Sequence, residues 1–152
     1  MQCASIYLFN MPVCVCLCVC LTLDLELELL NKLDSFGLPV VKAQGPILVD
    51  GTPVLLFERF ALGSKNVVRL DNKVITKVGS SPLLNQRSID DLTSIRKTMI
   101  EKNIWVNDLQ FLIGDDGRIV ISDPLDVDLR GPSKNSLRMI KLLIEVAEEN
   151  IK

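Results

Sequence analysis

The sequence contains no histidine. Without an imidazole, Ser-His-Asp and Cys-His catalysis, histidine metal sites and the usual pH switch near neutrality are all excluded. Cysteine is absent after residue 20, and the five that occur are Cys3, Cys14, Cys16, Cys18 and Cys20. A disulfide framework spreads its cysteines through the fold, so the body of this chain is typical of a reducing, cytoplasmic compartment. Any chemistry therefore falls to carboxylates, amides, lysines and arginines.

The chain also has little net charge. Seventeen Lys and Arg against nineteen Asp and Glu leave a formal charge of −2, which provides no basic field for nucleic acid. A length of 152 residues with 48% hydrophobic residues is enough for one globular domain with a real core. We expect a monomer that does not bind nucleic acid.

The N-terminal segment lacks charge altogether between residues 4 and 23. It is long enough for a membrane span, but no Lys or Arg precedes it and no A-x-A-like cleavage site follows. Apolar residues alternate with cysteines and then acids from Val13 to Leu29, and we interpret residues 1–30 as a low-complexity segment before a domain at 31–152. The alternatives are a membrane anchor at 4–23 and a C-x-C-x-C-x-C thiolate site for a soft metal.

The remaining pattern predicts an α+β fold with a β-rich first half and two later helices. Leu29, Leu30 and Leu33 could form one face of a helix that stops at Phe36-Gly37. Ser88 with Asp91 suggests a capping box, and Gly131-Pro132 separates that helix from a last one starting at Ser133 or Asn135. The predicted strands lie at 40–41, 46–49, 54–57, 67–70 and 74–78, with hairpin turns at Asp50-Gly51 and Asp71-Asn72.

The most informative stretch is W-V-N-D-L-Q-F-L-I-G-D-D-G-R-I-V-I-S-D-P-L-D-V-D at residues 105–128. Two apolar runs, 109–113 and 118–122, flank a Gly-Asp-Asp-Gly turn, which predicts an antiparallel hairpin. Asp108 enters the first strand and Asp123 leaves the second, so both carboxylates should lie at the same open edge. A base that accepts a hydroxyl proton beside a ligand for Mg²⁺ is the arrangement used in phosphoryl transfer.

This stretch resembles the protein-kinase core, and most closely the HopBF-type bacterial effectors, which are very small kinases. The specific part is D-L-Q-F-L-I-G…D-P-L, and the resemblance covers about residues 36 to 152. It implies a truncated kinase-like fold, with a partial β-rich N-lobe and a small helical C-lobe. It also implies ATP and Mg²⁺ as cofactors, Ser/Thr phosphorylation, and a eukaryotic heat-shock chaperone in the host cytosol as the protein substrate.

The resemblance also implies roles for particular residues. Asp108 matches the catalytic-loop Asp, and Asp123 matches the D-F-G Asp that holds the metal. Gln110 stands where many kinases place a Lys that contacts phosphate. The backbone of Glu58, Arg59 and Phe60 would contact adenine.

The chain departs from the kinase pattern at several points. No His-Arg precedes Asp108, and Ile113 stands where a second metal-binding Asn is expected. The first lysine is Lys32, so neither a Gly-rich loop nor a strand Lys precedes the segment that would match the kinase αC helix. Glu26 or Glu28 could stand where the αC Glu would lie, but it would lack its usual lysine partner. The alternatives to an active kinase are therefore a pseudokinase or a fragment that acts as a protein-binding module.

Overall fold

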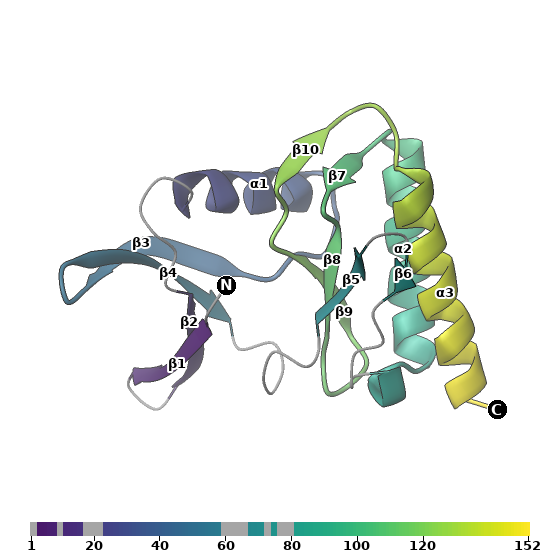
Figure 1. Cartoon of the computed structure of the whole chain (residues 1–152), viewed down its shortest axis with the longest axis horizontal. Coiled ribbons are helices and arrows are strands. Elements are labelled where there is room, and N and C mark those ends of the chain that lie inside the picture. The colour runs from purple at the N-terminus through teal and green to yellow at the C-terminus, as the bar shows by residue number, and fades with distance from the viewer. Residues whose placement is uncertain (1–2, 9–10, 17–22, 59–66, 72–73, 76–80) are drawn as a thin grey trace.

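The computed structural model describes the backbone of residues 3–8, 11–16, 23–58, 67–71, 74–75 and 81–152, with side chains at 23–58 and 82–152. Within these ranges the chain forms three sheets and three α-helices, so the predicted α+β class is confirmed. Figure 1 shows one sheet with a helix beside it at one side, a pair of helices at the other, and the central hairpin between them.

The N-terminal sheet has the strand order β1-β2-β4-β3. Its strands are β1 (Cys3–Leu8), β2 (Met11–Cys16), β3 (Ala43–Val49) and β4 (Thr52–Glu58). The predicted hairpin at Asp50-Gly51 is confirmed, and both turn residues have positive φ, at 49° and 77°. Because β2 pairs with β4, the cysteine-containing stretch lies beside a strand of the later chain. The division of the chain at residue 30 stays a sequence-based prediction.

The helix α1 (Leu23–Ser35) confirms the helical alternative for this stretch. Its buried residues are Leu23, Leu29, Leu30 and Leu33. The helix ends in a Schellman motif: the Leu38 N–H donates to Leu33 O at 3.2 Å, and the Gly37 N–H donates to Asp34 O at 2.8 Å. Gly37 supplies the positive φ of 81° that this ending requires, as its place after Phe36 predicted.

The second half is built on a sheet of order β6-β5-β8-β9 and a two-stranded ladder. Residues 39–41 run beside β9, where the Val41 N–H donates to Ile121 O at 3.0 Å, but they form one isolated parallel bridge between Val40 and Ile121 and not the predicted strand at 40–41. The strands are β5 (Val67–Asp71), β6 (Val74–Ile75), β7 (Trp105–Asn107), β8 (Gln110–Ile113), β9 (Ile119–Ser122) and β10 (Asp126–Asp128). The helices are α2 (Gln86–Glu101) and α3 (Lys134–Asn150), after a short 3-10 turn at Ser81–Leu83.

The predicted start of α2 is wrong. The N-cap is Asn85, whose side chain accepts from the Ser88 N–H at 3.3 Å, so Ser88 is the third helical residue and not the cap. The Ser88 hydroxyl completes the box by accepting from the Asn85 N–H, and it also donates to Gly117 O at 2.5 Å. Asp91 instead accepts from the Ile119 N–H at 2.9 Å. Asp91 therefore contacts the hairpin, which is distant in sequence, and does not act as the acid of a capping box.

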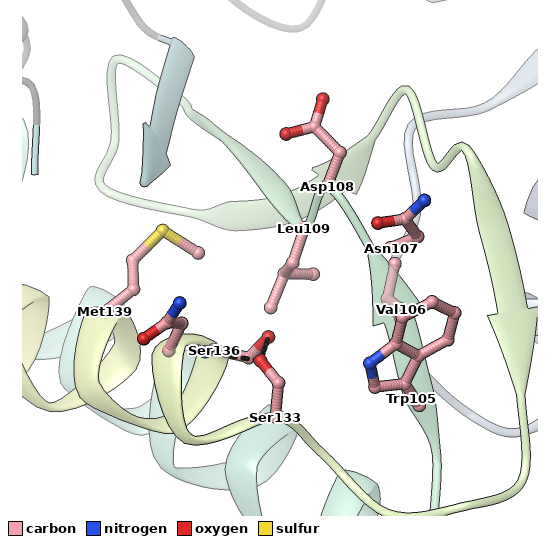
Figure 2. Close-up of a pocket in the computed structure, with 9 residues that line it drawn as sticks. Trp105, Val106, Asn107, Asp108, Leu109, Ser133, Ser136 and Met139 are labelled. Carbon is pink, nitrogen blue, oxygen red and sulfur yellow. Dashed lines mark hydrogen bonds between the residues drawn. The ribbon is translucent and has the colours of Figure 1, made fainter. Parts of the chain in front are cut away.

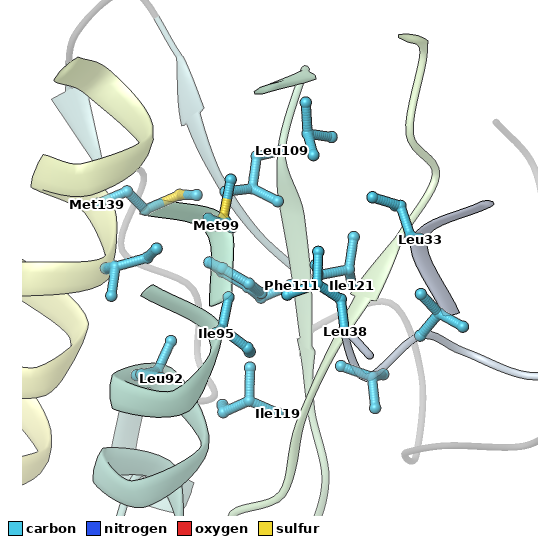
Figure 3. Packing of buried hydrophobic residues seen from close by; sticks show 14 of the residues in the cluster. Leu33, Leu38, Leu92, Ile95, Met99, Leu109, Phe111, Ile119, Ile121 and Met139 are labelled. Carbon is cyan, nitrogen blue, oxygen red and sulfur yellow. The ribbon is translucent and has the colours of Figure 1, made fainter. Parts of the chain in front are cut away.

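The core lies between the hairpin strands and the helices (Figure 3). Phe111, Ile119 and Ile121 of the hairpin pack with Leu92, Ile95 and Met99 of α2, while Leu33 and Leu38 approach from the α1 side. Ile100 follows the buried Met99 on α2 but is 42% exposed, although helical spacing with the apolar residues before it predicted a place on the buried stripe. Burying the branched side chains of both hairpin strands contributes roughly 1.5–3 kcal/mol each, which makes the hairpin the rigid centre of this half.

Candidate functional site

The central hairpin is formed as the sequence predicts. Its strands β8 and β9 pair antiparallel, from Ile113↔Ile119 at the turn to Gln110↔Ser122 at the open end. Asp108 lies two residues before Gln110 in the chain and Asp123 directly after Ser122, so both acids flank the last pair. The predicted approach of both acids to one end of the hairpin is therefore confirmed.

The turn at the other end is fixed to the start of α2. Gly117 has φ of 84°, and its N–H donates to Gly114 O at 2.9 Å. Arg87 pairs with Asp116 at 2.5 Å, and the Asn85 amide donates to Asp116 O at 3.0 Å. Asp116 is exposed, and the Arg118 backbone N–H, with the Arg87 charge as a smaller contribution, lowers the pKa of its carboxyl. These contacts stabilise the register that positions the acids.

Asp108 is held by its neighbour on the strand. Its φ is 54°, a left-handed conformation that residues other than glycine, asparagine and aspartate rarely adopt. The amide of Gln110 donates from Nε2 to Asp108 Oδ2 at 2.6 Å, and Gln110 itself is only 6% exposed. A buried amide with this hydrogen bond fixes the orientation of the half-buried Asp108 carboxylate.

Asp123 lies close to a second acid. It has φ of 48°, so both acids leave the regular strand conformation where they meet the open end. Burial raises the pKa of Glu26 in α1 to about 7, and the negative charge of Asp123 adds to that shift. The two carboxylates therefore lie within electrostatic reach of each other, and the structure selects Glu26 over Glu28 as the acid of α1 that faces the hairpin end.

Short contacts hold the surrounding segments in place. The ladder of β7 and β10 pairs Asn107 with Asp126, and the Leu125 N–H donates to Asn107 O at 3.2 Å. From α1, the Lys32 ammonium donates to Val127 O at 2.8 Å. The segments that precede Asp108 and follow Asp123 are thus tied to each other and to the helix that carries Glu26.

A pocket of about 340 Å³ opens beside Asp108 (Figure 2). One wall comes from residues 105–109, and the other comes from the start of α3, with Ser133, Asn135, Ser136 and Met139. The ring of Trp105 lies under the Arg130 guanidinium, which is 3.6 Å from the ring centroid. Trp105 is half-buried and Arg130 is exposed.

The three positions predicted to contact adenine are only partly described. Glu58 ends β4, its N–H donates to Lys42 O at 2.9 Å, and its side chain accepts from the Lys42 N–H at 3.1 Å. Arg59 and Phe60 lie outside the described residues. Adenine contact by these residues stays a prediction.

In the part of the chain that the structure describes, no group of three His, Cys, Asp or Glu side chains is arranged to hold a metal. In the same part, no helix is both long and apolar enough to cross a membrane. The side chains of the C-x-C-x-C-x-C motif lie outside those residues. Ile113, at the position of the second metal-binding Asn, is fully buried.

The comparisons with known proteins define the class of this chain. A family model for the kinase domain of the type III secretion system effector HopBF1 matches residues 14–151, and the chain belongs to that family. The α+β arrangement described above is accordingly a truncated kinase-like fold.

A relative with the same description is the type III effector protein HopBF1 of Pseudomonas syringae pv. syringae (strain FF5). It is 28% identical to this chain over 125 residues, which are 81% of this chain and 60% of the relative. The chain thus spans about three fifths of the curated relative it matches. The family match begins at residue 14, inside the segment that we interpreted as low complexity.

Sequence reasoning missed the pocket wall supplied by α3. The helix start was predicted at Ser133 or Asn135, but nothing in the spacing indicated that it would face residues 105–109. The sequence signal was the pair Ser133 and Ser136, because a capping serine followed three residues later by a second serine places two hydroxyls at a helix start. In the structure these hydroxyls lie 2.9 Å apart.

Proposed function

We propose that this chain carries a protein-kinase centre that transfers a phosphoryl group from ATP to a serine or threonine hydroxyl. The observation that supports the proposal is the open end of the hairpin, with Asp108 just before β8 and Asp123 directly after β9. Positioning and electrostatic stabilisation are most of what a kinase contributes to catalysis, so an acid on each side of this open end is the relevant feature.

In this proposal Asp108 orients the substrate hydroxyl and accepts its proton. The hydrogen bond from Gln110 leaves Asp108 Oδ1 as the oxygen that faces the substrate, since Oδ2 is already engaged. Gln110 was predicted from the resemblance to contact phosphate. Its hydrogen bond supports a role in holding Asp108, and its second amide hydrogen is the one that would serve a phosphate oxygen.

The residues at Asp123 fit a magnesium ion. Mg²⁺ prefers oxygen ligands, and the carboxylate of Asp123, with the Glu26 carboxyl within electrostatic reach of it, would supply them. The raised pKa of Glu26 reflects burial and a neighbouring negative charge, and a divalent cation would relieve the second of these. When bound, the ion supplies positive charge that balances the nucleotide phosphates.

We further propose that the substrate is a protein, and that the heat-shock chaperone implied by the family resemblance is the first candidate. The relative is described as a type III effector, which supports action inside a host cell. The backbone of Glu58, Arg59 and Phe60 is the proposed adenine contact.

The test compares three variants in one assay of ATP-dependent thermal stabilisation and phosphate transfer in Mg²⁺. Asp123→Ala should lose both, while Asp108→Asn should keep the ATP-dependent stabilisation and lose transfer by roughly 10²–10⁴-fold. Asp115→Ala is the matched control, because it removes an exposed carboxylate from the turn at the far end of the same hairpin. An ATP response in Asp123→Ala equal to that of the control would end the enzyme proposal.

A second candidate function is a catalytically inactive kinase-like module that binds a partner protein. It is supported by Glu26, since no cation pairs with it among the residues that the structure describes, whereas active protein kinases pair this acid with a strand Lys. The same assay separates the two candidates, because an inactive module would show no phosphate transfer and no difference in ATP response between wild type and Asp123→Ala.

A further inference from the structure

Lys32 links α1 to the segment that follows Asp123. Its ammonium donates to Val127 O at 2.8 Å, across 95 positions of the chain, in a partly buried hydrogen bond. Figure 1 shows β10, which contains Val127, beside α1. The same helix carries Glu26, whose carboxyl lies within electrostatic reach of Asp123. Helix α1 therefore meets residues 123–128 at two places, one near each end of that segment.

The carbonyl that accepts this hydrogen bond is held in place by its own surroundings. Val127 is only 3% exposed and is the Cα partner of Val106 in the ladder of β7 and β10. Its N–H donates to Asp126 Oδ1 at 2.8 Å. The next pair of the ladder joins Asp126 to Asn107, which directly precedes Asp108. A bond to this carbonyl thus fixes α1 to the segments that carry both acids.

Other contacts of α1 fix its position less specifically. Its buried leucines pack by area and shape, which is a non-directional interaction. The ion pair between Lys42 and Asp34 joins two side chains that are both more than half exposed, and such a pair contributes little. Lys102 donates to Phe36 O at 2.8 Å, but this carbonyl lies beyond the end of the helix. The Lys32 bond differs from these contacts, because a charged donor meets a partly buried acceptor and the bond is directional.

Protein kinases hold the αC helix by an ion pair between its Glu and a strand Lys. In this sequence the first lysine is Lys32, which lies on the helix itself. We propose that Lys32 is a positioning residue, which holds α1 against the segment after Asp123 by its bond to Val127. Glu26 thereby stays close to Asp123. The inference rests on the function proposed above, because it takes Asp123 as the magnesium ligand.

The expected effect is on the magnesium-dependent part of nucleotide binding. Without the Lys32 bond α1 can move and Glu26 no longer stays beside Asp123, so fewer oxygen ligands face the cation. Lys32→Met keeps the apolar stem and removes the donor, and it should weaken the Mg²⁺-dependent part of ATP binding roughly tenfold. ATP binding measured without Mg²⁺ should stay unchanged. A merely structural contribution of Lys32 would lower both.

Two further variants make the comparison specific, and each is tested in the full chain. Lys32→Arg restores a charged donor on a long side chain, and it should recover Mg²⁺-dependent binding to within about twofold of wild type. Lys102→Met is the matched control, because Lys102 also donates to a backbone carbonyl at 2.8 Å, at the end of α1 and not on the segment after Asp123. This control should bind Mg²⁺ and ATP as wild type does.

Hydrogen exchange gives a measurement that needs no nucleotide. In Lys32→Met, the amides of residues 23–35 and 125–128 should exchange faster together, by roughly tenfold, because one bond ties the two segments. Lys32→Arg should keep the protection of wild type. Lys102→Met should leave the exchange of residues 125–128 unchanged.

Three results would overturn the inference: unchanged Mg²⁺-dependent binding in Lys32→Met, an equal loss in Lys102→Met, or no recovery in Lys32→Arg. If Asp123→Ala loses the ATP response while Lys32→Met keeps it, the kinase proposal stands and the role of Lys32 is refuted. If wild type itself shows no Mg²⁺-dependent response, the kinase proposal fails, and the joint change in hydrogen exchange decides whether Lys32 fixes α1 to this segment.

Discussion

Replacement of Glu26 by glutamine should stabilise the protein above neutral pH and have little effect in acid. The pKa of Glu26 lies near 7 in the folded protein against an ordinary value of 4.5, so the folded state holds a proton that the unfolded state releases. Between those two values the unfolded chain binds fewer protons, and stability falls as the pH rises. Below pH 4.5 Glu26 is protonated in both states. Above about pH 7 it is ionised in both states, and the folded protein is destabilised by the full free energy of holding a buried negative charge beside Asp123.

The size of the effect follows from the same interval. A difference of about 2.5 pH units corresponds to roughly 3.4 kcal/mol at 1.36 kcal/mol per unit. Glu26 is only partly buried, and water screens its interactions, so we expect about 1–2 kcal/mol. For a domain of this length that is a rise of roughly 2–8 °C in Tm for Glu26→Gln at pH 8.

The measurement is a series of thermal melts of wild type and Glu26→Gln from pH 4 to pH 8. The two Tm curves should coincide near pH 4 and separate as the pH rises to about 7. Glu28→Gln is the matched control, since Glu28 is exposed on the same helix and should show no such separation. A constant difference between wild type and Glu26→Gln at every pH would show that Glu26 does not titrate as described. Added Mg²⁺ should also stabilise wild type more at pH 8 than at pH 5.5, because protonation of Glu26 competes with the cation.

Three further substitutions test the support of the site. Gly117→Ala should lower the free energy of unfolding by about 1–3 kcal/mol in chemical denaturation, because Gly117 has φ of 84° and an added Cβ would collide with the Asn85 side chain; an unchanged midpoint would contradict the packing of this turn. Phe111→Ala should lower it by about 3–5 kcal/mol in the same assay, since this ring is fully buried in the core, and a loss below 1 kcal/mol would be inconsistent with that position. Gln110→Leu should reduce phosphate transfer by roughly tenfold or more and alter its pH profile while ATP binding is retained, because Asp108 loses its hydrogen bond; a weaker ATP affinity with an unchanged rate would instead indicate the phosphate contact.

The hairpin and the helices could be predicted because their signals are local. Gly114 to Gly117 specifies the turn, and alternating or helical spacing of apolar residues specifies the elements on either side. The position of Asp108 and Asp123 at one end follows from antiparallel pairing alone. The end of α1 could be predicted as well, since Gly37 after Phe36 is a local stop signal.

The features that could not be predicted depend on contacts between distant segments. The local spacing predicted Ser88 as the N-cap of α2. In the structure the Ser88 hydroxyl donates to the Gly117 carbonyl, and the N-cap is Asn85. The choice of Glu26 over Glu28 depends on which side of α1 faces Asp123, which the alternating sequence does not reveal. The α3 wall of the pocket depends on tertiary packing in the same way.

The position of the hairpin turn has a consequence for how the sequence can vary. The Gly114–Gly117 loop lies at the opposite end of β8 and β9 from both acids, so a residue inserted there would break the contacts of the turn with Asn85 and Arg87 and leave the spacing between Asp108 and Gly114 unchanged. A single residue inserted inside β8 or β9 would instead reverse the alternation of side chains and turn Phe111 or Ile121 out of the core. Homologous chains should therefore keep the number of residues between Asp108 and Gly114 constant.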